Sequence, residues 1–237
     1  IPHKLCGILA DDMGLGKTLQ TIGLISIDKT SSPSLIICPK SLVFNWCYEF
    51  MRFAPDIKVV KVFGSQEERK QIIKNIDKNK RVVYITSYDS LRNDLDNYNI
   101  EFQYLILDEA QAIKTFTSKK SQSVKQLKAL HRFALTGTPI ENSALELWSI
   151  FDFLMPGYLD DIDLFKKRFE TEKDYKEKVA KRISLFILRR TKKDVLKDLP
   201  EKMERVIEAE MTTEQRKTYD AYCVIAKKAL KSSPNVF

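Results

Sequence analysis

The chain has 237 residues, of which 43% are hydrophobic and 30% charged, and this composition excludes an intrinsically disordered protein. A chain of that length can bury a core without disulfides or structural metals, and no apolar run reaches the roughly 18 residues that a membrane span needs. The net charge is +8, which suits a polyanionic partner, and the basic excess per residue is larger after Pro156.

Residues 1–140 alternate short apolar runs with helical patterns. The runs are hydrophobic throughout rather than alternating, which is typical of strands covered by helices on both faces of a parallel sheet. Helical patterns lie between them, including one that Ser41 would cap. We therefore predict an α/β fold with a mostly parallel sheet flanked by helices. The strand-like runs are residues 5–10, 35–38, 57–63, 82–86, 104–107 and 133–136.

The pattern changes after Pro139 and becomes mainly helical. Helices are expected at residues 145–154, 165–169 and 175–188, and a last strand at 206–210. Thr212 would cap a final helix that has Glu214 and Gln215 early in its first turn. We expect two parts, namely an α/β lobe at 1–156 and a basic helical extension at 157–237.

The sequence ADDMGLGKT, residues 10–18, lies between a predicted strand and a predicted helix. Glycines there let backbone N–H groups approach a phosphate chain, Lys17 would neutralise phosphate charge, and the Thr18 hydroxyl would hold Mg²⁺. The strict phosphate-loop pattern G-x-x-x-x-G-K-[ST] is broken, because Asp11 occupies its first glycine position.

Two further motifs follow at the ends of predicted strands. LILDEAQ, residues 105–111, carries an acidic pair, in which Asp108 would bind Mg²⁺ and Glu109 would orient and deprotonate an attacking water. LTGTPIEN, residues 135–142, closes a strand with two hydroxyl residues around a glycine. The spacing of the acidic pair after the phosphate loop predicts a nucleotide site.

Together GLGKT, DEAQ and LTGTP resemble the first RecA-like lobe of a helicase superfamily two motor, and more closely the SWI/SNF-type ATPases. The phosphate loop of that family reads Asp-x-Gly-x-Gly-Lys-Thr, which residues 12–18 match, so the missing glycine is expected. Three further segments are similar to this family: ICPKSLVFNWCYEF (37–50), LWSIFDFLMPGYL (147–159) and FILRRTKKDVLKDLPEK (186–202). The last two distinguish the chain from RNA helicases.

The resemblance implies ATP hydrolysis that drives movement along double-stranded DNA. It assigns catalysis to Lys17, Asp108, Glu109 and Gln111, and Mg²⁺ binding to Thr18 and Asp108. It places ATP against Asp12, Gly14, Leu15, Gly16, Lys17, Thr18, Thr136 and Gly137. Gln111 and the segment 136–138 would couple the nucleotide to DNA.

The resemblance also implies a grip on the DNA backbone by Pro39, Lys40 and Ser41 and by Thr86, Ser87 and Tyr88. The first group has a physical basis of its own, because a lysine and helix-start N–H groups suit a phosphate and read no base sequence. The alternative is that Ser41 only caps its helix and Lys40 is solvated. The basic stretch 181–193 would contact DNA, dock a second lobe or form a solvated rim.

Two parts of the family are not found in this chain, namely a glutamine-containing segment before the phosphate loop and a second RecA-like lobe with arginine fingers. We therefore expect a monomeric part of a longer protein, with no membrane partner and scarcely any hydrolysis on its own. The expected location is the cytoplasm or nucleoid of a bacterium or archaeon, or a eukaryotic nucleus. The alternatives are a superfamily-two RNA helicase and a non-catalytic nucleic-acid-binding scaffold.

Overall fold

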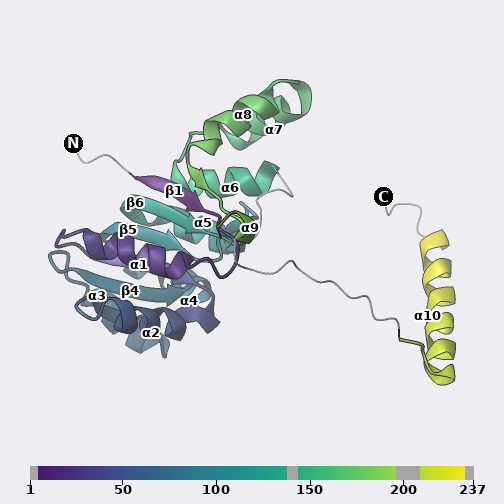
Figure 1. Cartoon of the computed structure of the whole chain (residues 1–237), viewed down its shortest axis with the longest axis horizontal. Helices are drawn as coiled ribbons and strands as arrows, with labels where there is room; N and C mark the ends of the chain where they lie inside the picture. Colours follow the sequence, from purple (N-terminus) through teal and green to yellow (C-terminus); the bar gives the residue numbers. More distant parts are fainter. Residues whose placement is uncertain (1–4, 138–143, 196–208, 233–237) are drawn as a thin grey trace. The chain divides into compact units, whose positions relative to one another are not determined.

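A computed structural model describes residues 5–137, 144–195 and 209–232 (Figure 1). The chain divides into two compact units, Ile1–Lys197 and Asp198–Phe237. The boundary predicted at Pro156 lies inside the first unit, because the chain returns to the sheet after that residue. The first unit contains the sheet and its helices.

Within the described residues, seven strands form one sheet in the order β3-β4-β2-β5-β6-β1-β7, and every neighbouring pair is parallel. The predicted fold class is therefore confirmed. Because the strands are parallel, their carboxyl ends meet at one edge, where open α/β sheets bind ligands. The strands are β1 (Cys6–Leu9), β2 (Ser34–Cys38), β3 (Lys58–Lys61), β4 (Val82–Ser87), β5 (Glu101–Leu107), β6 (Lys128–Leu135) and β7 (Ile187–Leu188).

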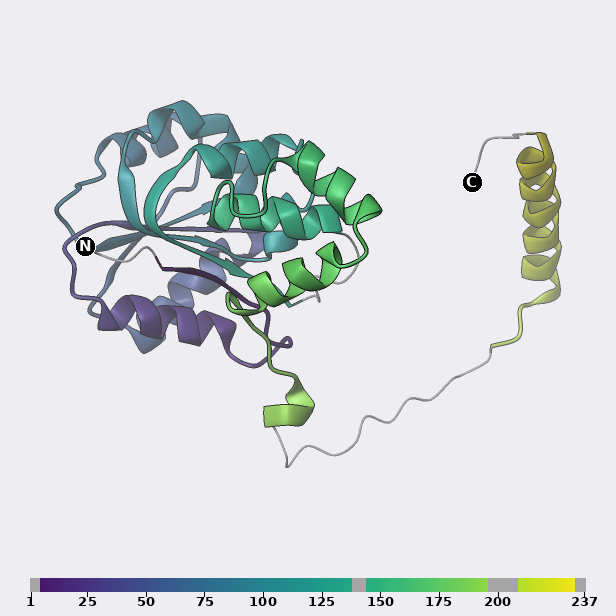
Figure 2. The ribbon, with the colours of Figure 1, turned by 90° about the horizontal axis from the view of Figure 1, so that it is seen from above.

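Helices cover both faces of this sheet. α1 and α2 lie on one face, whereas α4, α5 and α6 lie on the other, as the two views show (Figures 1 and 2). The helices of the first unit are α1 (Lys17–Ile27), α2 (Val43–Phe53), α3 (Gln66–Lys74), α4 (Tyr88–Asp94), α5 (Lys119–Gln126), α6 (Ala144–Leu154), α7 (Ile162–Thr171), α8 (Tyr175–Ser184) and α9 (Lys192–Val195).

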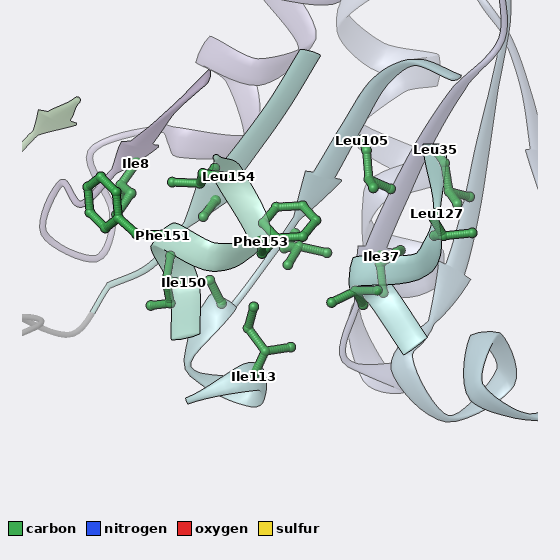
Figure 3. Close-up of a cluster of buried hydrophobic side chains, with 14 of the residues drawn as sticks. Ile8, Leu35, Ile37, Leu105, Ile113, Leu127, Ile150, Phe151, Phe153 and Leu154 are labelled. Carbon is green, nitrogen blue, oxygen red and sulfur yellow. The ribbon is translucent and has the colours of Figure 1, made fainter. Parts of the chain in front are cut away.

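The central strand β2 explains why its apolar run is unbroken. Leu35 and Ile37 belong to the core beneath α5 and α6, and Ile36 belongs to the core beneath α1 and α2, so side chains on both faces are buried. Figure 3 shows the first of these cores, with Phe151 and Phe153 of α6 packed over the strands. Complete burial of each such side chain contributes about 1.5–3 kcal/mol.

Two predicted elements differ from the structure. The helix expected to run to residue 188 ends at Ser184, and β7 then pairs with β1 through Ile187 and Leu188. Ser41 does not cap α2, because it lies inside a short 3₁₀ turn, Lys40–Leu42. The residue directly before α2 is Leu42, which makes no side-chain cap. In the first case the chain after Ser184 becomes a strand because its backbone pairs with β1. In the second case a tight turn after Pro39 takes the place of the helix start predicted at Ser41.

The second unit contains α10 (Thr213–Ser232). The predicted cap is confirmed, because Gln215 N–H donates to Thr212 Oγ1 at 3.3 Å and Thr212 N–H donates to Gln215 Oε1 at 3.0 Å. Of the strand expected at 206–210, residues 206–208 lie outside the described residues, and 209–210 are not in a strand. Among the helices that the structure describes, none is long and apolar enough to cross a membrane.

Candidate functional site

The loop between β1 and α1 occupies residues 10–16 at the carboxyl edge of the sheet. Gly14 and Gly16 have φ values of 89° and 78°, a left-handed conformation that disfavours any side chain. Gly16 immediately precedes α1, so the free N–H groups of the first helical turn open toward the loop. The loop therefore has an open backbone next to the start of α1, at the position where the sequence predicts phosphate binding.

Lys17 is the first residue of α1, and its side chain folds back over the loop. Its Nζ donates to Asp11 O at 2.6 Å and to Asp12 O at 3.3 Å. Gly137, after β6, lies directly opposite, since a Cβ on it would be 3.6 Å from Lys17 Nζ and 2.9 Å from Met13 Cγ. The lack of a side chain at Gly137 thus keeps space free around the Lys17 ammonium group.

Asp108 follows β5, and two donors orient its carboxylate. Trp46 Nε1 donates to Oδ2 at 2.8 Å, and the Glu109 N–H donates to Oδ1 at 2.9 Å. Burial raises the pKa of Asp108, and so does the Glu109 charge, whereas the Trp46 hydrogen bond and the Lys17 charge lower it; the net shift is upward. The sequence interpretation treated Trp46 as part of a family motif and missed its contact with the carboxylate.

A hydrogen-bonded chain joins the two later motifs. Gln111 Nε2 donates to Glu109 Oε2 at 2.6 Å, and Thr136 Oγ1 donates to Gln111 Oε1 at 3.2 Å. Glu109 has a φ of 51°, an unusual conformation for a residue with a side chain and one found at functional sites. The structure thus brings together Lys17, Asp108, Glu109, Gln111 and Thr136; the predicted Thr138 lies outside the described residues.

The remaining predicted nucleotide contacts lie along the same loop and helix start. Asp12 is half-buried and its Oδ2 accepts the Lys192 N–H at 3.0 Å, while Leu15 and Thr18 are half-buried. Thr18 is one residue after Lys17 in the first turn of α1, as a hydroxyl ligand near the phosphate loop requires. Their contact with a nucleotide remains a prediction.

The second predicted DNA-contacting group is inside the lobe. Tyr88 is 3% exposed, and its hydroxyl donates to Asp108 O at 2.8 Å. Thr86 is fully buried in β4, and Ser87 accepts the Ser90 N–H at 3.1 Å as the cap of α4. These three side chains are therefore occupied by contacts within the lobe and do not present a surface to DNA. Tyr88 instead supports the strand end that carries the acidic pair.

The first predicted DNA-contacting group does reach the surface. Lys40 and Ser41 are exposed, and Pro39 is half-buried at the end of β2. Lys40 Nζ lies 5.8 Å from the centroid of the Phe63 ring, and Lys61 Nζ lies 4.6 Å from that of Phe44. This part of the sheet edge therefore presents ammonium groups beside aromatic rings.

The donor set matches what a magnesium–nucleotide complex needs. Carboxylate and hydroxyl oxygens are hard ligands suited to Mg²⁺, and Asp108 and Thr18 supply one of each. Lys17 and the left-handed glycines supply the cation and the open backbone that phosphates require. Within the described residues, no group of three or more His, Cys, Asp or Glu side chains is placed to hold a metal ion.

Comparison with known families and proteins identifies the chain's family. The family described as the SNF2-related domain matches residues 3–235. The chain belongs to this family. Its RecA-like fold matches the SWI2/SNF2 ATPase core of Sulfolobus solfataricus, solved in complex with double-stranded DNA, with a TM-score of 0.73 and 38% identity over 99% of this chain and 50% of that one.

Relatives of this SNF2-related domain include proteins named as ATP-dependent helicases and as TATA-binding protein-associated factors. An uncharacterised ATP-dependent helicase of Mycoplasma genitalium is 44% identical over 98% of this chain and 23% of its own length. The TATA-binding protein-associated factor MOT1 of Saccharomyces cerevisiae is 42% identical over 92% of this chain and 13% of its own length. The chain therefore spans about a quarter or less of these relatives.

Proposed function

We propose that this SNF2-related domain is the N-terminal ATPase lobe of an ATP-dependent translocase or remodeller of double-stranded DNA. The observation that carries the proposal is the convergence of Lys17 with Asp108, Glu109, Gln111 and Thr136 at one sheet edge, where hydrogen bonds join the last four residues to one another. The likeness to an ATPase core solved with double-stranded DNA supports DNA as the partner.

In the proposed site, the phosphates of ATP lie against the backbone of Gly14 and Gly16, and Lys17 leaves its two carbonyl partners to neutralise them. Thr18 and Asp108 hold Mg²⁺, which when bound offsets the negative charge of the phosphates. Trp46 keeps the Asp108 carboxylate in one orientation. These residues bind and orient, which is most of what phosphoryl transfer asks of a protein.

Glu109 is the proposed base that accepts a proton from the attacking water. Gln111 holds one Glu109 oxygen, so a displacement of Gln111 would turn the base away from the water. Thr136 connects Gln111 to the end of β6, and its N–H donates to Leu9 O at 3.1 Å, beside the phosphate loop. DNA bound at Lys40 and Ser41 would change the rate of hydrolysis by shifting these hydrogen-bonded residues, which lie at the same edge of the sheet.

The test measures ATP hydrolysis by the full-length protein with and without duplex DNA. Lys17→Ala is expected to abolish turnover and weaken nucleotide binding, whereas Lys29→Ala, near the other end of α1, keeps both. Glu109→Gln is expected to abolish turnover and keep nucleotide binding, because it removes a base and no phosphate contact. Glu101→Gln, at the opposite end of β5, is its matched control.

Unchanged turnover in Lys17→Ala or Glu109→Gln would refute the site. Stimulation by RNA in place of duplex DNA would instead support the RNA helicase alternative. A wild-type protein that binds nucleic acid without hydrolysing ATP would support the scaffold alternative.

A further inference from the structure

Asp11 begins the phosphate loop where the strict pattern has glycine, and it is fully buried. An ionised carboxylate inside a protein is costly unless a cation and hydrogen bonds compensate it. The carboxylate therefore needs a partner, and the neighbouring cation, Lys17, donates to the Asp11 carbonyl oxygen instead.

The partner is Arg190, which is 179 residues away along the chain. Its backbone N–H and its Nε donate to Asp11 Oδ1 at 3.0 and 3.1 Å, and its Nη2 donates to Oδ2. Gln20 Nε2 donates to Oδ2 at 3.2 Å, and Gln20 Oε1 accepts from Arg190 Nη2 at 2.6 Å. Burial raises the pKa of Asp11, but these hydrogen bonds outweigh it, so the pKa is lowered and the group is ionised.

The chain reaches this position because β7 continues past its last residue along the loop. Ala10 N–H donates to Leu188 O at 2.8 Å and Asp12 N–H donates to Arg190 O at 3.0 Å, so the pairing extends beyond the strand. Next to this, Lys192 lies against the loop, and its Nζ is 3.8 Å from where a Cβ on Gly14 would be. The segment 188–192 therefore forms one side of the phosphate loop.

We propose that Arg190 is a positioning residue of the phosphate site. Arg190 holds Asp11 in place, and the carbonyl oxygens of Asp11 and Asp12 accept hydrogen bonds from Lys17. When Lys17 leaves these oxygens for the phosphates, the contact between Arg190 and Asp11 keeps the loop open. The inference rests on the proposed function, because it concerns the same nucleotide. It adds that the loop is not self-sufficient and depends on the segment that leads out of the first unit.

The first measurement needs no nucleotide. Thermal unfolding of the full-length protein is compared for Arg190→Gln, Asp11→Asn and the double variant. Because Arg190→Gln leaves Asp11 buried without its cation, its melting temperature is expected to fall, and adding Asp11→Asn is expected to restore part of the loss. Lys193→Gln, an exposed lysine on α9, matches the change in charge and is expected to leave the melting temperature unchanged.

The second measurement is the affinity for ADP with Mg²⁺, by titration calorimetry, and the KM for ATP. Arg190→Gln is expected to weaken ADP binding about tenfold and to raise KM more than it lowers kcat, because binding requires the loop geometry. Lys193→Gln is expected to stay within about twofold of wild type. Should Arg190→Gln fail to fold, the double variant, which buries no unpaired carboxylate, replaces it in this measurement.

The outcomes separate the two proposals. Additive effects of Asp11→Asn and Arg190→Gln on stability would show that Arg190 does not stabilise Asp11, whatever the protein hydrolyses. Coupled effects on stability with an unaltered affinity for ADP would show a purely structural ion pair and overturn the positioning role. If the stability effects are coupled but the wild-type protein binds no ADP, the proposed function is refuted and, with it, the role of Arg190.

Discussion

The contact between Trp46 and Asp108 decides the charge of the residue proposed to hold the metal. Burial beside Glu109 raises the pKa of Asp108, and the hydrogen bond from Trp46 Nε1 opposes that rise. A carboxylate must be ionised to bind Mg²⁺, so activity is lost as the pH falls through this pKa. The hydrogen bond from Trp46, whose side chain is 1% exposed, opposes this loss by lowering the pKa of Asp108.

Trp46→Phe is expected to move the acid limb of the pH profile of ATP hydrolysis to higher pH. Phenylalanine keeps much of the volume and removes the donor, so the pKa of Asp108 rises further. The measurement is kcat/KM against pH in the full-length protein. Trp148→Phe removes a donor to Asp160 O instead and is expected to leave the acid limb in place. If the acid limb also stays in place in Trp46→Phe, the role of Trp46 at Asp108 is contradicted.

Tyr88→Phe tests whether Tyr88 is a support rather than a DNA contact. Losing its hydroxyl leaves Asp108 O without this donor, so unfolding in urea is expected to show a loss of about 1–2 kcal/mol. DNA affinity is expected to stay unchanged, because the side chain is buried. Lys40→Ala is expected to lower DNA affinity and to leave the stability unchanged. A loss of DNA affinity in Tyr88→Phe without any loss of stability would instead support Tyr88 as a DNA contact.

At the scale of elements, the sequence predicts the strands that have unbroken apolar runs. It also predicts the order in which these strands and the helices follow one another along the chain. The run at 35–38 indicates two buried faces, and the structure buries both. Glycines and charged pairs at strand ends predicted where Lys17 and Asp108 would meet, because carboxyl ends of parallel strands share an edge.

The seventh strand and the burial of Tyr88 could not be read from the sequence. Two residues, Ile187 and Leu188, are too few to show a strand period, and their pairing depends on β1, which lies far away in the chain. The signal that could have revealed the ion pair of Asp11 and Arg190 is an acid directly after one apolar run and a base two residues after the end of another. Such a pair is recognisable only once the two strands are known to be neighbours.

The cap of α10 gives a prediction for an element that the structure describes by itself. Thr212→Ala removes the acceptor for the Gln215 N–H and is expected to destabilise the helix by about 1 kcal/mol, lowering helicity in its first turn. NMR secondary chemical shifts of the chain measure this. Thr213→Ala, one residue later, is the matched control, and equal losses in both variants would exclude the cap as the cause.

At the scale of the whole molecule, four free thiols report on folding in different places. Cys38 is buried in β2, and burial together with the Asp108 charge raises its pKa, so both access and reactivity are low. Cys223 is half-buried on α10, in the second unit. Cys6 and Cys47 are half-buried in the first unit, and burial raises the pKa of each.

Labelling with a thiol reagent is therefore expected to modify Cys223 first and Cys38 last. The rate at Cys38 should rise with urea in step with unfolding of the first unit, since only opening of the sheet exposes it. Mass spectrometry of digested, labelled chain follows each site. A Cys38 that labels as fast as Cys223 in native buffer would contradict the buried position of β2.

The position of β1 in the sheet has a consequence for synthesis on the ribosome. This strand, residues 6–9, is made before the other described strands of the sheet, yet its two neighbours are β6 and β7, the last two of these strands to be made. At about 5–20 residues per second, β1 waits on the order of 6–25 s for β6 to be translated. During that interval the backbone N–H and C=O groups along both edges of β1 lack their partner strands, and the sheet is completed only after residues 187–188 have been made.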